Sequence, residues 1–123
     1  MKISKRLSWL KPYLMLACHR YHIKMPLSVR AFTPRWDKNQ DSLAMVTKVG
    51  LKNYRISIHM YYKEDTGDLI LLPNIMILDS LAHELAHIKE WSHNKDWKKL
   101  YQDIYSEFKK IHIEGNNRSL TNA

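Results

Sequence analysis

The chain has 123 residues, the length of one domain, and its single cysteine excludes an internal disulfide. Its 20 Lys and Arg against 12 Asp and Glu give a net charge of +8, which favours polyanionic partners such as DNA. No apolar run approaches the roughly 20 residues of a membrane span, so membrane association is not expected. Lys11 and Pro12 interrupt the apolar stretch that a signal peptide would need, and we therefore expect a cytoplasmic protein.

The first third of the chain predicts one helix and one extended segment. Pro12 is suited to the first turn of a helix, because its missing N–H has no partner there. The expected apolar face of this helix consists of Leu14, Met15, Cys18 and Tyr21. The extended segment is Val29–Thr33, and the polar composition of Trp36–Ser42 predicts a loop after it.

Two further strands are predicted at Leu43–Val49 and Tyr54–Tyr61. In the second, Ile56, Ile58 and Met60 alternate with polar residues, and this period of two indicates a half-buried strand. Such a strand is either a sheet edge, along which an extended substrate pairs its backbone, or a core strand paired on both sides; the pattern leaves both open. His59 then either points into a cleft or is a half-exposed strand residue.

The last third of the chain predicts two helices. The first begins with Asn74 as its N-cap and continues to about Trp91, and the second covers Asn94–His112. Apolar residues recur at helical spacing in the first of them: Leu78, Leu81, Leu85 and Ile88. The fold class is therefore α+β, with an N-terminal helix, a small three-stranded antiparallel or mixed sheet and two C-terminal helices. Residues 1–112 form the single predicted domain, and residues 113–123 form a polar, disordered tail.

The first of these two helices contains the motif HExxH, formed by His83, Glu84 and His87. At 3.6 residues per turn, the two histidines lie about 40° apart around the helix and one turn apart along it, so their imidazoles converge on one ion. Glu84 lies about 60° from His87, beside the ion, where a carboxylate can hold and deprotonate a water. The alternative interpretation is an amphipathic helix with two solvent-facing histidines. We favour a metal site, because the histidines lie opposite the apolar stripe.

A catalytic zinc ion needs a third protein ligand, and two residues are the main candidates. His93 follows His87 by six positions, and it reaches the ion only if the helix breaks near Trp91. Glu107 lies further along the last helix, where a solvated surface carboxylate is the simpler interpretation. Asp96 is a more distant candidate. We therefore favour His93.

Residues 83–97 (HELAHIKEWSHNKDW) resemble the HELxH-x5-H-x3-[FW] motif of the SprT-like and YgjP-like zinc metallopeptidases. The resemblance implies a minimal zincin-like domain that binds one Zn²⁺ through His83, His87 and His93. It also implies that Glu84 is the general base, and that Trp97 packs behind the third ligand. The metzincins share the histidine spacing, but they carry a glycine where this chain has Glu90, which argues against membership of that group.

These residues predict a zinc metallopeptidase that hydrolyses peptide bonds of a protein or peptide substrate. Glu84 takes a proton from the activated water and delivers it to the departing amine. Tyr101 or Tyr105 is a candidate donor to the oxyanion. Two alternatives stay open: a nucleic-acid-associated protein that processes DNA-bound proteins or only binds DNA, and a structural zinc domain in which Glu84 has no catalytic role.

Overall fold

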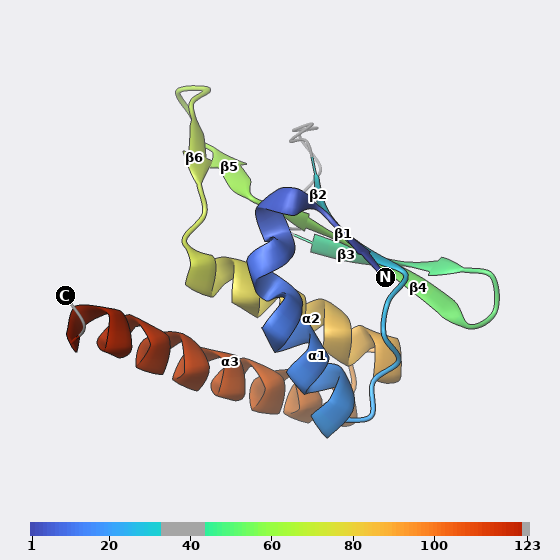
Figure 1. Ribbon diagram of the computed structural model, residues 1–123. Coiled ribbons are helices and arrows are strands. Elements are labelled where there is room, and N and C mark those ends of the chain that lie inside the picture. Colours follow the sequence, from blue (N-terminus) through green and yellow to red (C-terminus); the bar gives the residue numbers. More distant parts are fainter. Residues whose placement is uncertain (33–43, 122–123) are drawn as a thin grey trace.

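The computed structural model describes residues 1–32 and 44–121 (Figure 1). In chain order the elements are β1 (Lys2–Ile3), a 3-10 helix (Lys5–Leu10), α1 (Lys11–Arg20), β2 (Ser28–Phe32), β3 (Ala44–Val49), β4 (Asn53–His59), β5 (Tyr61–Lys63), β6 (Leu69–Leu71), α2 (Asn74–Lys89) and α3 (Lys95–Thr121). This order confirms the predicted α+β class. The predicted loop at 36–42 lies outside the described residues.

The main sheet has four strands in the order β1-β2-β4-β3. β3 pairs antiparallel with β4, while β2 pairs parallel with both β4 and β1, so the sheet is mixed. The fourth strand, β1, has only two residues and was not predicted. Because β4 is hydrogen-bonded on both sides, it is the core strand of the two predicted alternatives. Among the described strands, the edge next to β4 is β3.

The register of the sheet separates an inner face from an outer face. Val29, Ile56 and Ile58 are fully buried on the inner face, and the three helices lie on this side of the sheet (Figure 1). Arg30 and Arg55 belong to the outer face, where both are exposed. A strand places successive side chains on opposite faces, so the core and the charged surface are built from alternate residues of the same strands.

α2 is buried on nearly all sides, because it contacts β3 and β4 on one side and α3 on the other. Leu78, Leu81 and Leu85 are fully buried, which confirms the predicted apolar stripe. The helix begins one residue earlier than predicted, since Pro73 is the N-cap and Asn74 the first helical residue. It ends at Lys89, close to the predicted break, because Glu90 has extended dihedrals (φ −125°, ψ 92°).

The remaining helices differ from prediction at two points. Met15 of α1 is 52% exposed, so its predicted place on the apolar face was wrong; Ala17 occupies that face with Leu14 and Cys18. The predicted helix end at His112 was also wrong, because helical backbone continues to Thr121. Burial raises the pKa of the Cys18 thiol to about 11. None of the helices in the described part of the chain is both long and apolar enough to cross a bilayer.

A two-stranded hairpin, β5 with β6, projects from the body of the molecule in Figure 1. Tyr61 pairs with Leu71 and Lys63 pairs with Leu69. Each strand has three residues, too few for alternation to show a strand, and the hairpin was not predicted.

Candidate metal centre

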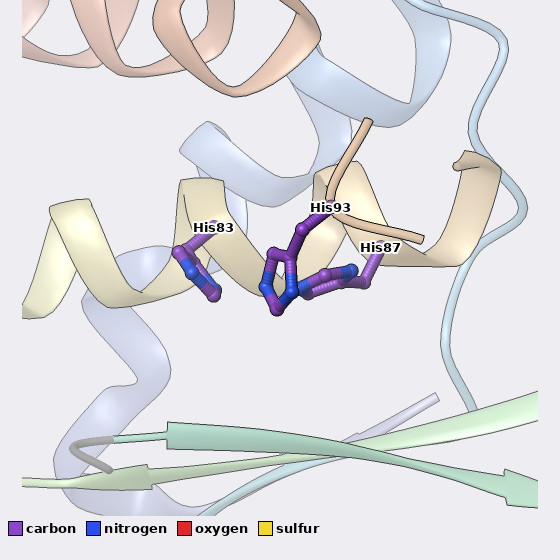
Figure 2. Close-up of side chains that lie close together, drawn as sticks. All are labelled: His83, His87 and His93. Atoms are coloured by element: carbon purple, nitrogen blue, oxygen red, sulfur yellow. The ribbon is translucent and has the colours of Figure 1, made fainter. Parts of the chain in front are cut away.

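The structure brings the three predicted zinc ligands together. One nitrogen from each of His83, His87 and His93 lies within 4.8 Å of the others. The ring centroids are 4.9 Å apart for His83 and His87, 5.7 Å for His83 and His93, and 4.4 Å for His87 and His93. Figure 2 shows that two of the imidazoles come from α2 and that the third reaches back from the chain after the helix.

The chain reverses between α2 and α3, and this turn returns His93 to the helix that it has just left. Glu90 is extended at the upstream end of the turn. At the downstream end, the Asn94 side chain caps α3 by accepting a hydrogen bond of 2.9 Å from the Trp97 backbone N–H. Asn is a favoured N-cap because its oxygen satisfies a helix donor that lacks an intrahelical partner. The sequence therefore starts a new helix immediately after the third histidine.

His87 is set up as a metal ligand by its surroundings. Its Nδ1 lies 3.0 Å from the backbone carbonyl of Trp91, which can only accept a hydrogen bond. Nδ1 therefore carries the proton, and Nε2 is left with the lone pair that a metal binds. Burial lowers the pKa of His87, although the Glu84 charge opposes the shift. Burial therefore favours the neutral imidazole that metal binding requires, and the hydrogen bond to Trp91 fixes which nitrogen is free.

Glu84 is 4% exposed and lines an open hollow together with the three histidines. Its Oε1 is 3.0 Å from Nδ1 of His83, so this hydrogen bond also directs Nε2 of His83 away from the carboxylate. The hollow has a volume of about 440 Å³ and is lined by the three histidines, Glu84, Trp91 and the β3 residues Ala44, Met45 and Val46. The carboxylate is therefore positioned to contact a molecule held between the metal centre and the edge strand.

Trp97 packs against the histidines, at the position that the sequence motif predicts. Its ring lies edge-to-face with His93 at 4.5 Å and stacks on His87 at 4.9 Å. The indole N–H also donates a hydrogen bond of 3.4 Å to the backbone carbonyl of His83. The first turn of α3 thus packs against the imidazoles and limits their rotation.

Glu107, the alternative third ligand, is engaged elsewhere. Its carboxylate forms an ion pair with Arg20 and accepts a hydrogen bond of 2.8 Å from the Tyr21 hydroxyl. Asp96 is exposed at the start of α3. Neither carboxylate belongs to the group of potential ligands around His83 and His87 in the described part of the chain. Glu107 therefore connects α3 to the end of α1 and is not a ligand of the metal centre.

The two tyrosines considered as oxyanion donors do not line the hollow. Tyr101 lies 5.4 Å from His83 by ring centroids, but its hydroxyl donates a hydrogen bond to Asp79. Burial, followed by this contact with Asp79, raises the pKa of Tyr101. Tyr105 stacks on Tyr101 at 6.1 Å, one turn further from the site. The structure therefore supports neither hydroxyl as the donor.

The position of His59 differs from prediction, and one residue of the site was not predicted at all. His59 is 3% exposed, so the half-exposed placement was wrong, and it is not among the residues that line the hollow. Burial lowers its pKa. The sequence analysis missed the role of Trp91, whose carbonyl holds His87 and whose side chain lines the hollow. A backbone acceptor leaves no sequence signal, and only the aromatic character of Trp91 could have drawn attention to it.

Comparison with known proteins supports the fold. The chain matches no protein-family model and no curated protein. Among solved structures, it is similar to the crystal structure of Wss1 from Saccharomyces cerevisiae, with a TM-score of 0.66 and 17% identity over 93% of this chain and 90% of that one. The chain has the fold of Wss1. A Wss1 mutant from the same organism gives a TM-score of 0.62 at 17% identity, covering 93% of this chain and 91% of that one.

The three imidazoles fit a transition-metal centre. Imidazole nitrogen suits zinc, copper, iron and nickel, and three histidines with an open fourth position are typical of catalytic zinc. A tetrahedral zinc ion with bonds of about 2.0–2.1 Å needs its nitrogens about 3.4 Å apart. The observed nitrogens lie within 4.8 Å of one another, so binding requires the rings to move closer together. The donor set therefore agrees with zinc.

Proposed function

We propose that this protein is a zinc-dependent metallopeptidase with His83, His87 and His93 as metal ligands and Glu84 as general base. The observation that carries the proposal is the position of Glu84, a buried carboxylate beside three converging imidazoles at the wall of an open hollow. A structural zinc site needs neither an open hollow nor a buried carboxylate at its wall. The Wss1-like fold and the motif resemblance support the same function.

The mechanism assigns each step to a residue of this chain. Zinc, when bound, polarises the peptide carbonyl and lowers the pKa of water at the site. Glu84 accepts the proton of the attacking water on its carboxylate and returns it to the nitrogen of the departing amine. The hydrogen bond with His83 keeps the Glu84 carboxylate beside the hollow while it does so.

The substrate is expected to lie along β3. This strand is an edge of the described sheet, and its residues Ala44–Val46 form the wall of the hollow opposite the histidines. Through its backbone, an edge strand can hydrogen-bond an extended peptide, and we assign this contact to Met45 and Val46, beside the metal centre. The proposed substrate is therefore a protein or peptide segment in extended conformation.

Substitution of Glu84→Gln tests this function directly. The amide cannot accept the water proton, so turnover of an unfolded protein substrate should fall about 10²–10⁴-fold. Zinc content, measured by elemental analysis, should stay at that of the unsubstituted protein, because Glu84 is not a ligand. Glu90→Gln is the matched control, since Glu90 does not line the hollow. Unchanged turnover in Glu84→Gln would contradict the peptidase mechanism and favour a structural zinc domain.

Association with nucleic acid is a second candidate function, supported by a separate surface. A hollow of about 810 Å³ lies beside β1, β2 and β4, and no carboxylate of the described residues lines it. Its polar lining is Lys2, Ser4, Ser28, Arg30 and Arg55, and its apolar lining is Met1, Ile3, Leu27 and Val29. We propose that this surface contacts the phosphates of DNA, because clustered Lys and Arg release counterions on binding.

Fluorescence anisotropy of labelled DNA at about 50 and 200 mM salt tests the second candidate. Combined substitution of Arg30→Gln and Arg55→Gln should weaken binding and reduce the slope of log affinity against log salt by about 2. Lys98→Gln with Lys99→Gln removes the same charge from an exposed part of α3 and serves as control. Absence of binding by the unsubstituted protein at the lower salt concentration would end this proposal.

A further inference from the structure

The turn between α2 and α3 supplies two features of the metal centre within three residues. Trp91 provides the carbonyl that accepts the hydrogen bond from Nδ1 of His87, at 3.0 Å. His93 provides the third imidazole. Any movement of this turn therefore displaces His93 and breaks the hydrogen bond that orients His87. What fixes the turn in space decides the geometry of the whole centre.

The side chain of Trp91 ties this turn to the sheet. Lys48 of β3 places its Nζ 4.1 Å from the centroid of the Trp91 ring, within the range of a cation–π contact. Tyr54 of β4 lies 6.1 Å from the same ring by centroids, tilted by 35°. Lys48 and Tyr54 are directly paired in the antiparallel register, so their side chains stand on the same face of the sheet.

Trp91 is not a core residue, since 47% of its surface is exposed. Its covered surface is in contact with residues from both strands and with the ring of His87, at 6.5 Å between centroids. The downstream end of the turn has its own anchors, the Asn94 cap and the packing of Trp97. The contacts of Trp91 fix the upstream end of the turn, where Glu90 follows α2 in an extended conformation.

We propose that Trp91, held by Lys48 and Tyr54, is a positioning residue that fixes His87 and His93 for metal binding; this inference rests on the metal centre of the proposed function. The β3–β4 ribbon thereby sets the geometry of ligands that belong to a different part of the chain. Groups that orient metal-binding histidines typically change metal affinity by about 10–100-fold when removed. Here the orienting group is a backbone carbonyl, and the side chain acts by fixing its place.

Zinc affinity and the visible spectrum of the cobalt-substituted protein test this inference without reference to activity. Trp91→Ala should weaken zinc binding about tenfold, measured by competition with a chromophoric chelator, and should change the cobalt absorption bands that report ligand geometry. Trp91→Phe keeps an aromatic ring against Lys48 and Tyr54 and should restore both properties. Lys48→Met removes only the charge and should weaken zinc binding about two- to fivefold.

Lys109→Met is the matched control, because Lys109 also lies over an aromatic ring, that of Tyr105 at 4.7 Å, but on the far part of α3. It should leave zinc affinity and the cobalt spectrum unchanged. If Trp91→Ala and Lys48→Met both behave like Lys109→Met, the positioning role is wrong while the peptidase proposal stands. If the unsubstituted protein binds no zinc, both fall. Should Trp91→Ala fail to fold, Lys48→Met against Lys109→Met decides.

Discussion

The two halves of α3 are attached to different neighbours. The first turns contact α2 at the metal centre. The Trp97 indole donates a hydrogen bond to the backbone carbonyl of His83, and the Tyr101 hydroxyl donates one to Asp79, which lies one turn before that histidine. The later turns contact α1, where Glu107 meets Arg20 and Tyr21. One continuous helix therefore serves the site at its beginning and the stability of the fold further along.

This division explains why His93 and Glu107 have such different roles. His93 immediately precedes the cap of α3, where the helix begins against the α2 histidines. Glu107 lies in the half of α3 that faces α1, close to Phe108, whose ring packs edge-to-face on Tyr13 at 5.4 Å. We expect substitutions in the first half to change metal binding, and substitutions in the second half to change only the free energy of unfolding.

The largest effect is expected for His93→Ala. Loss of one of three ligands should reduce zinc affinity more than about 100-fold, beyond the effect typical of an orienting group. Glu107→Ala in the same chelator competition should bind zinc like the unsubstituted protein. Full zinc retention by His93→Ala, with loss in Glu107→Ala, would reverse the assignment of the third ligand.

A smaller effect is expected for Glu107→Ala on stability. The substitution leaves the Tyr21 hydroxyl without its acceptor and removes the ion pair with Arg20. Because Arg20 is 57% exposed, solvent screens the ion pair, and the total loss should be about 1–2 kcal/mol in urea unfolding. Glu64→Ala, in the exposed loop between β5 and β6, is the control. A loss as small as that of the control would mean that the later turns of α3 are held by apolar packing alone.

The smallest effect concerns pH. Burial raises the pKa of Tyr21, the Asp103 charge raises it further, and Arg20 opposes the shift. The folded protein therefore holds this proton at a pH where the unfolded chain releases it. The resulting stabilisation is complete below the ordinary value of 10.0 and declines as pH rises from there through the raised pKa of the folded protein. Urea unfolding between about pH 9 and 11 should show a shallower decline in Tyr21→Phe than in the unsubstituted protein. Parallel declines would contradict a buried, protonated Tyr21.

The metal-binding part of the molecule was the most predictable from sequence. His83 and His87 are one turn apart on a helix, so their convergence follows from helix geometry alone. The position of His93 required only a helix break, which the structure shows at Glu90. Predictions over such short separations depend on few degrees of freedom. The β3 wall of the hollow was missed because it comes from a segment about forty residues away in sequence.

The sheet was less predictable for the same physical reason. The parallel pairing of β2 with β4 joins segments separated by β3, and the two-residue β1 has too few residues for any periodic pattern. Alternation of Ile56 and Ile58 showed that β4 has a buried face, but not whether its backbone groups were paired on one side or two. Strand order depends on long-range contacts, which local composition does not encode.

The single cysteine of the chain makes the molecule convenient for site-specific labelling. With a pKa of about 11, the Cys18 thiol is ionised in only about one molecule in 10⁴ at neutral pH, and its side chain is buried. Leu51 is 99% exposed in the turn that joins β3 to β4, next to Gly50 at φ +68°. A Leu51→Cys variant should therefore accept a maleimide dye at one position without removal of the native thiol. A dye there would report on the ribbon that carries Lys48 and Tyr54.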